Sequence, residues 1–168
     1  GSFIAERLPS RLTAEEIVLT GKYKSSILYA PYGQTELNQA REMLASIGGQ
    51  DLIGRSYASL SQGEKQLLLI ARSLMEKPEL LILDEATSGL DLFARERLLD
   101  QIGKITQMDQ APTILYVTHH VEEITAAMDH VLLLKEGEII AQGPKEDIFQ
   151  KEVMDRFYPQ PVELIELG

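Results

Sequence analysis

The segment LILDEATSGLD, residues Leu81 to Asp91, decides which fold the rest of the sequence supports. A short apolar run ends in two adjacent carboxylates, Asp84 and Glu85, and a glycine-containing turn with a third acid follows it. An unbroken apolar run of this length is typical of a buried strand. In parallel α/β sheets, ligands bind beyond the carboxyl ends of the strands. We therefore expect a ligand site where this strand ends.

Two further apolar runs of the same kind follow, Ile114–Val117 and Val131–Leu134. A helical stretch precedes each of them, Leu92 to about Met108 and then Val121–Met128. Strands that are apolar on both faces and alternate with helices indicate a parallel sheet covered on both sides. After the third strand, Glu136-Gly137 predicts a turn into an antiparallel strand, Glu138–Gln142, and Pro144 begins one or two terminal helices.

The part of the sequence before this pattern is helical. Thr13 and Glu16 predict a capping box for a helix over Ala14–Thr20 that Gly21 ends, and Thr35 predicts the cap of a second helix reaching about Ile47. Ser61 and Glu64 form another capping box, and the helix behind it ends before Pro78. The stretch from Lys22 to Gly33 has no clear period and is predicted to be a loop.

Composition excludes several classes of function. Of the 168 residues, 44% are hydrophobic, so the chain can bury a core. The formal net charge of −10 argues against nucleic acid as a partner, because non-specific binding needs a basic face. The sequence has no cysteine, which excludes disulfides, thiolate metal sites and thiol catalysis. No apolar run approaches the ~18 residues that a membrane span needs.

The polar groups at the predicted strand ends suit phosphate chemistry. An acid such as Asp84 at the end of an apolar strand can hold Mg²⁺, directly or through water, and Mg²⁺ bridges nucleotide phosphates. Glu85 can polarise an attacking water, and His119, which follows the next strand, can contact a terminal phosphate. Taken alone, an Asp-Glu pair is more often a capping or solvated pair, and a single histidine is more often structural.

The start of the helix after Ser61 is a second candidate site. Ser61 and Gly63 open a helix whose free N–H groups and positive dipole end attract anions, and Gly63 allows close approach of a phosphate. An ordinary capping box formed by Ser61 and Glu64 explains the same residues equally well when they are taken alone.

The order of four motifs favours the phosphate interpretation. The sequence contains LSQGEKQ (Leu60–Gln66), LLILDE (Leu80–Glu85), SGLD (Ser88–Asp91) and THH (Thr118–His120). In this order they resemble the signature motif, Walker B strand, D-loop and switch-histidine loop of the ATP-binding cassette (ABC) family of ATPases. The resemblance covers about the latter two-thirds of the chain, and Pro9–Gly21 also resembles the start of the family's helical subdomain.

The resemblance implies an α/β fold, a partial RecA-like P-loop NTPase core with a parallel sheet and flanking helices, plus an ABC-type helical subdomain. It implies a helical subdomain in residues 1–60, the signature helix and the C-terminal half of the core in 61–143, and terminal helices and tail in 144–168. It also implies ATP and Mg²⁺ as ligands. The site residues carried over are Glu85 and His119 as catalytic groups, Asp84 as a Mg²⁺ ligand through water, and Ser61, Gln62, Gly63 and Asp91 as nucleotide-binding residues.

The function implied is that of the ATP-hydrolysing subunit of an ABC transporter. Two such subunits pair head-to-tail around ATP and act on membrane-spanning subunits, at the cytoplasmic face of the membrane. A soluble relative acting on the ribosome or on DNA is the alternative, and a non-enzymatic binding module is a third hypothesis. The compact helical segment Thr13–Gln50 favours the transporter type, and Asp84, Glu85 and His119 argue against the binding module.

One family motif is missing from these residues. The phosphate cradle G-x-x-x-x-G-K-[ST] does not occur: the two Gly-Lys pairs, Gly21-Lys22 and Gly103-Lys104, are followed by Tyr23 and Ile105. We therefore expect a cassette truncated ahead of the signature motif, which does not hydrolyse ATP by itself. Without the cradle strand, we expect either that Val131–Leu134 pairs with Ile114–Val117, or that the chain self-associates through the sheet edge near Val117.

Overall fold

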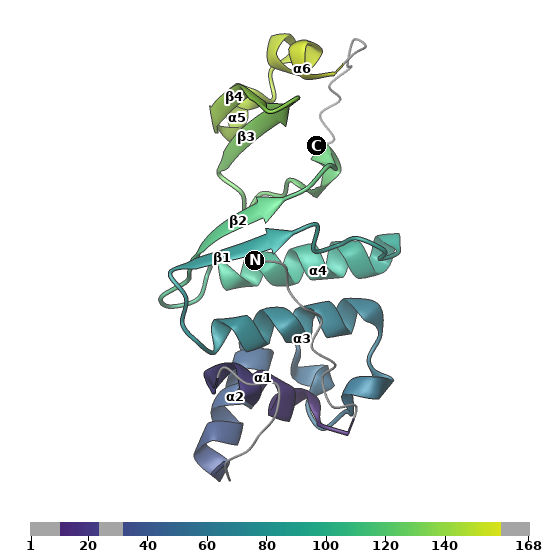
Figure 1. Cartoon of the computed structure of the whole chain (residues 1–168), viewed down its shortest axis with the longest axis vertical. Coiled ribbons are helices and arrows are strands. Elements are labelled where there is room, and N and C mark those ends of the chain that lie inside the picture. The colour runs from purple at the N-terminus through teal and green to yellow at the C-terminus, as the bar shows by residue number, and fades with distance from the viewer. Residues whose placement is uncertain (1–10, 24–31, 159–168) are drawn as a thin grey trace. The chain divides into compact units, whose positions relative to one another are not determined.

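The computed structural model describes residues 11–23 and 32–158 of the chain (Figure 1). The chain divides into two compact units, Gly1–Glu123 and Ile124–Gly168, and each is described by itself. The loop expected over Lys22–Gly33 lies mostly outside the described residues, and the expected tail from Pro159 lies wholly outside them. The domain boundaries expected near residues 60 and 143 stay predictions.

Among its described residues, the first unit consists of helices and one two-stranded parallel sheet. The elements are α1 (Ala14–Lys22), α2 (Gln34–Ser46), the 3-10 turns η1 (Gln50–Leu52) and η2 (Tyr57–Ser59), α3 (Gln62–Leu74), β1 (Leu80–Asp84), α4 (Leu92–Ile105), β2 (Thr113–Val117) and the 3-10 turn η3 (Val121–Glu123). This order confirms the expected α/β class, in which a helical first part precedes the strands.

Helix α1 starts as the sequence predicts but does not end at Gly21. The capping box of Thr13 and Glu16 is present, and the helix continues through Gly21 to Lys22. Gly21 is buried against α3, where an added Cβ would lie 2.0 Å from the carbonyl oxygen of Arg72. The glycine is therefore needed for close approach of two helices, and the predicted helix stop was wrong.

Helix α2 begins one residue before Thr35, the predicted cap. Gly33 occupies the N-cap position, and its N–H donates to Oε2 of Glu36 at 3.0 Å. Because Glu36 stands three residues after Gly33, the carboxylate closes the first turn and Thr35 lies inside the helix. Helix α4 ends at Ile105, ahead of the predicted Met108.

Strands β1 and β2 pair in parallel, in a register that places Asp84 beside Val117. This pairing confirms the expected parallel sheet. Leu81 and Leu83 are buried, whereas Leu80 and Ile82 on the opposite face are 51% and 54% exposed. Among the described residues of this unit, the sheet is covered on one face only, so the expectation of cover on both faces is not met.

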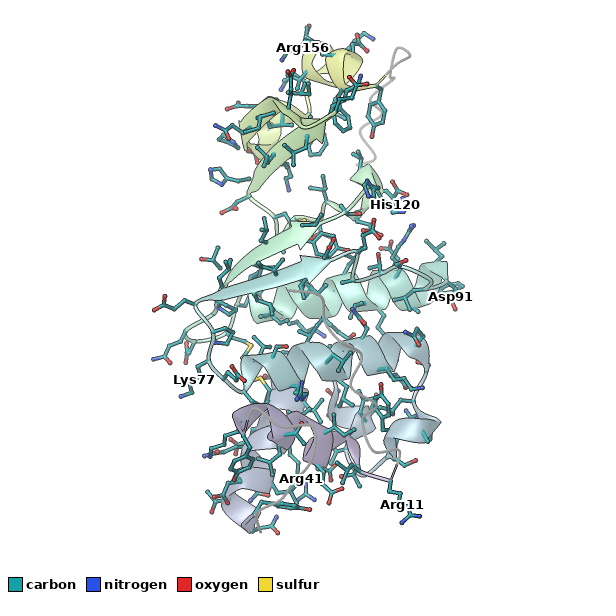
Figure 2. The ribbon with its side chains drawn as sticks, in the orientation of Figure 1. Arg11, Arg41, Lys77, Asp91, His120 and Arg156 are labelled. Carbon is teal, nitrogen blue, oxygen red and sulfur yellow. The ribbon has the colours of Figure 1, made fainter. Side chains whose placement is uncertain are left out.

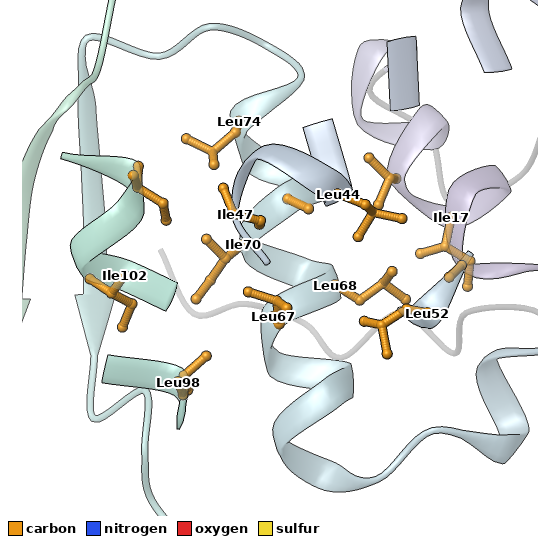
Figure 3. Close-up of a cluster of buried hydrophobic side chains, with 14 of the residues drawn as sticks. Ile17, Leu44, Ile47, Leu52, Leu67, Leu68, Ile70, Leu74, Leu98 and Ile102 are labelled. Carbon is orange, nitrogen blue, oxygen red and sulfur yellow. The ribbon is translucent and has the colours of Figure 1, made fainter. Parts of the chain in front are cut away.

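The core of the first unit joins the sheet to all four helices. Figure 3 shows Leu67, Ile70 and Leu74 of α3 between Leu98 and Ile102 of α4 and the α1–α2 side. The remaining labelled members are Ile17, Leu44, Ile47, Leu52 and Leu68. Helix α3 is therefore the central support, and both its beginning and the end of β1 are held by buried apolar contacts.

The second unit is an antiparallel hairpin with two short helices. Strand β3 (His130–Lys135) pairs with β4 (Glu138–Pro144), followed by α5 (Lys145–Ile148) and α6 (Lys151–Phe157). Glu136 and Gly137 have φ of 53° and 81°, the backbone of a tight hairpin turn, as the sequence predicted. The two ladders form separate sheets, so in the described residues Val131–Leu134 does not pair with Ile114–Val117.

The helix predicted over Val121–Met128 is also wrong. Only the 3-10 turn η3 forms there, over Val121–Glu123. Glu123 is buried, and its carboxylate accepts a hydrogen bond from Thr118. The conformation of this stretch therefore depends on side-chain contacts with other residues, which hydrophobic periodicity does not predict.

Candidate functional site

The carboxyl ends of β1 and β2 bring together the acids and the histidine that the sequence singled out. Asp84 is the last residue of β1, and Glu85 follows with a positive φ of 49°. The Glu85 N–H donates to the carbonyl oxygen of Val117 at 2.9 Å, so the parallel ladder continues one step past the strand. A non-glycine residue in the left-handed region is uncommon, and such residues concentrate at functional sites.

Glu85 and His119 meet directly. Nε2 of His119 lies 2.9 Å from Oε1 of Glu85, and the two side chains are 81% and 49% exposed, respectively. The adjacent His120 points to a different partner, since its Nδ1 lies 3.6 Å from Glu122. Figure 2 shows His120 beyond the end of β2. The two histidines therefore differ in their partners: His119 contacts the Glu85 carboxylate, and His120 contacts Glu122.

A buried carboxylate beside this pair was not singled out from the sequence. Glu123 is 1% exposed, and Thr87, Tyr116 and Thr118 all donate hydroxyl hydrogen bonds to it. Burial raises the pKa of Glu123, but the bonds from Thr118, Thr87 and Tyr116 outweigh it and hold the pKa below its usual value. Nothing in the local sequence separates Glu123 from its exposed neighbour Glu122.

The start of α3 has the capping box that the sequence predicted. The Ser61 hydroxyl accepts from the N–H of Glu64 at 3.3 Å, and Glu64 Oε2 accepts from the Ser61 N–H at 2.7 Å. Arg55 donates to the same carboxylate at 2.7 Å. Burial acts to raise the pKa of Glu64, yet the bonds from Arg55 and Ser61 lower it. Gln62, the first residue of α3, is exposed.

Gly63 is not required by packing within the described chain. An added Cβ there would meet Ala94 at 3.5 Å and Leu90 at 3.8 Å, which are ordinary contact distances. A glycine at this position leaves room at a helix start, where the first N–H groups have no partner inside the helix.

Asp91 caps the next helix and lies near the start of α3. Its Oδ1 accepts from the N–H of Ala94 at 2.9 Å, which makes Asp91 the N-cap of α4 (Figure 2). A cavity of about 250 Å³ is lined by Ser61, Gly63 and Asp91 together with residues of α3 and α4. Asp84, Glu85 and His119 do not line it. Six of the predicted residues thus fall into two groups, Asp84, Glu85 and His119 at the strand ends and Ser61, Gly63 and Asp91 around this cavity. Gln62 does not line the cavity and lies between Ser61 and Gly63 at the start of α3.

The strand-end group offers oxygen ligands, which are the kind that Mg²⁺ prefers. Within residues 11–23 and 32–158, no cluster of three or more His, Cys, Asp or Glu side chains is arranged to hold a metal. Asp84 fits Mg²⁺ only as one carboxylate among ligands supplied by water and phosphate. In the same residues, no helix has both the length and the apolar character to span a membrane.

The chain matches known proteins across this whole arrangement. Residues 3–88 match the family described as ABC transporter, a range that includes Ser61, Gly63, Asp84 and Glu85 but ends before Asp91 and His119. A protein named as an ABC transporter ATP-binding protein in Streptococcus mutans is 69% identical over 99% of this chain and 64% of its own length. The uncharacterised ABC transporter ATP-binding protein YmeB of Lactococcus lactis is 56% identical over 98% of this chain and 63% of its own length.

Solved structures agree with these relatives. The cbiO1 protein of Clostridium perfringens, part of the ABC transporter complex cbiONQ, superposes with a TM-score of 0.71 at 26% identity, over 89% of this chain and 57% of that one. The chain spans less than two thirds of the length of the relatives it matches.

Proposed function

This chain belongs to the ABC transporter family of ATP-binding proteins, and we propose that it forms the signature and catalytic-carboxylate part of a transporter ATPase. The observation that carries the proposal is the pairing of Glu85 with His119 at 2.9 Å, beside Asp84 at the end of a parallel strand. This is the edge of an α/β sheet where ligands bind.

Each group at the strand ends has a role in this proposal. Asp84 is the residue that would hold Mg²⁺ through water, and the ion would supply positive charge to neutralise the phosphates. Glu85 acts as the general base that takes a proton from the attacking water. His119 contacts the terminal phosphate and, through its bond to Glu85, keeps that carboxylate turned toward the same point.

The residues around the cavity have a different role. Ser61, Gly63 and Asp91, which line the cavity, contact ATP held by a second ATPase subunit in a head-to-tail pair. Gln62, the exposed first residue of α3, contacts the same ATP from beside the cavity. Two observations support this separation: the cavity residues form a group apart from Asp84, Glu85 and His119, and packing within this chain does not require glycine at position 63. The start of α3 supplies free N–H groups and a positive dipole end for an anion.

The partners follow from the same family role. We propose that the ATPase pair docks on membrane-spanning subunits at the cytoplasmic face of the membrane and couples ATP hydrolysis to transport. Recovery of a polytopic membrane protein together with the ATPase supports this assignment, and recovery with ribosomes instead overturns it.

Two further proposals concern the chain by itself. Because its 168 residues contain no phosphate cradle, we propose that it does not hydrolyse ATP alone. We also propose that it self-associates through the β2 side of the sheet. On the outward face, Leu80, Ile82, Leu115 and Val117 are 39% to 54% exposed, and β2 has a ladder partner on only one edge in the described residues.

The catalytic assignment is tested by Glu85→Gln in a polypeptide that carries a phosphate loop ahead of this chain. ATP binding should be kept while hydrolysis falls at least ~100-fold, since the amide cannot accept a proton. Glu79→Gln, just before the opposite end of β1, is the matched control and should keep the wild-type rate. Unchanged turnover in Glu85→Gln would remove Glu85 from this role.

A further inference from the structure

The buried carboxylate of Glu123 is held by hydroxyl groups from three places in the chain. Thr87 Oγ1 donates to Oε1 at 2.5 Å, while Thr118 Oγ1 and Tyr116 Oη donate to Oε2 at 2.5 and 2.9 Å. No lysine or arginine forms an ion pair with it in the residues that the structure describes. A buried charge is costly unless it is fully hydrogen-bonded, and here hydroxyl donors alone satisfy it.

Two of these donors come from the two segments that carry the catalytic pair. Thr87 lies in the turn that follows Glu85, and the N–H of Ser88 donates to the Glu85 carbonyl at 3.0 Å in that same turn. Thr118 immediately precedes His119, and its hydroxyl also accepts from the N–H of His120 at 3.0 Å. The Glu123 carboxylate therefore accepts one hydrogen bond from the segment of Glu85 and one from the segment of His119.

The third donor does not belong to either segment. Tyr116 is a residue of β2, already fixed by its ladder to β1. Its bond to Glu123 starts from a strand and not from a loop, although its hydroxyl also interacts with Thr87. Of the three hydrogen bonds to Glu123, those from Thr87 and Thr118 come from loops and that from Tyr116 comes from a strand, so removing them one at a time separates the two kinds.

We propose that Glu123 is a positioning residue that couples the Glu85 segment to the His119 segment and fixes the geometry of the catalytic pair. The inference rests on the proposed function, and it extends that function to a residue outside the strand ends. Glu85 and His119 are both exposed, so their own packing does not fix them. Stability alone does not explain a carboxylate buried at position 123, because an apolar side chain of similar size is often at least as stabilising.

The kinetic test uses Thr87→Val and Thr118→Val, which each remove one hydroxyl with little change of shape, in the polypeptide with a phosphate loop. Each should lower kcat about tenfold with KM for ATP within about twofold, because misplacement of a catalytic group acts on the chemical step. Tyr116→Phe removes a bond to the same carboxylate but leaves both loop bonds, and it should keep kcat within about twofold. Equal effects of all three variants, or no effect of the two valine variants, would overturn the proposal.

A second measurement does not depend on ATP hydrolysis and uses this chain alone. Amide hydrogen exchange is followed at Ser88 and His120, one in each segment, with Leu68 in the core as the control for global opening. Coupling predicts effects across segments: Thr87→Val should speed exchange at His120, and Thr118→Val should speed exchange at Ser88, each at least about threefold. Tyr116→Phe should change neither.

The two measurements separate the failure of this inference from failure of the proposed function. Cross-segment exchange in this chain, together with no ATPase activity in the polypeptide that carries a phosphate loop, supports the coupling and rejects the function. Exchange that changes only within the mutated segment, in an active ATPase, overturns the role of Glu123 and leaves the function standing.

Discussion

Nε2 of His119 lies 2.9 Å from Oε1 of Glu85, although the two residues follow different strands. The contact exists because β1 and β2 are parallel and in a register that brings Asp84 beside Val117, so the two strands end at the same edge. A one-residue shift in that register would turn the side chains to opposite faces. The first prediction rests on this pair.

His119→Ala should slow ATP hydrolysis about tenfold or more in a polypeptide with a phosphate loop, because it removes both a phosphate contact and the partner of Glu85. His120→Ala is the matched control, since its imidazole faces Glu122 instead, and it should leave the rate within about twofold. Steady-state ATPase assays of the two variants decide between the histidines. An intact rate in His119→Ala would return this residue to a purely structural role.

The 168-residue chain alone should bind Mg-ATP with a Kd above about 1 mM, which corresponds to a binding free energy weaker than about 4 kcal/mol. Asp84 is one carboxylate, and a hydrated Mg²⁺ held by a single carboxylate binds weakly. Titration calorimetry of the chain, compared with a polypeptide that carries a phosphate loop, measures the difference. Micromolar affinity in the chain alone would show that the missing motif is not needed.

The chain should self-associate in solution, and Leu115→Lys should reduce this association. Leu115 lies on the outward face of β2 and is 49% exposed, and a charge on such a strand opposes pairing with another chain. Leu69→Ala removes an exposed apolar side chain of α3, 37% exposed, that belongs neither to the sheet nor to the cavity, and it serves as the control. Light scattering over a range of concentrations follows the mass. A clean monomer at every concentration contradicts the proposal.

Gly21→Ala should lower the free energy of unfolding by about 1–3 kcal/mol, the usual cost of overpacking a core. The new methyl would lie 2.0 Å from the Arg72 carbonyl oxygen, a backbone atom that moves only if α1 and α3 separate. At Gly33, an added methyl meets only the flexible end of the Glu36 side chain, so Gly33→Ala should cost much less. Urea denaturation of the two variants provides the comparison. Equal stability would mean that the helices are not in close contact.

Tyr116 should not ionise near its usual pKa of 10.0, because burial and its bond to the Glu123 carboxylate raise the pKa to about 12. The raised pKa means that Tyr116 contributes stability that is fully present below pH 10 and is lost as the pH rises toward about 12. Phenolate absorbance of the chain minus that of Tyr116→Phe isolates this group. Glu123→Gln should lower the pKa, whereas Thr118→Val should not. Ionisation near pH 10 in the folded chain contradicts the buried contact.

The sequence by itself determined the features whose causes are local. The capping boxes at Thr13 and Ser61 are set by residues three apart, and the turn at Glu136-Gly137 is set by two adjacent residues. Apolar runs alternating with helices predicted the parallel pairing of β1 with β2, because parallel neighbours need a crossover connection that a helix provides. The acids at the strand end therefore followed from the pattern alone.

Only the tertiary structure decided what depends on residues far apart in the sequence. Gly21 lies inside a helix because a second helix passes close to it, and the same residue in isolation predicts a helix end. Glu123 is buried because hydroxyls from two loops and a strand surround it, and no local pattern distinguishes it from Glu122. Hydrophobic periodicity describes one element at a time, whereas the hydrogen bonds from Thr87 and Thr118 to Glu123 form between segments far apart in the sequence or across a turn.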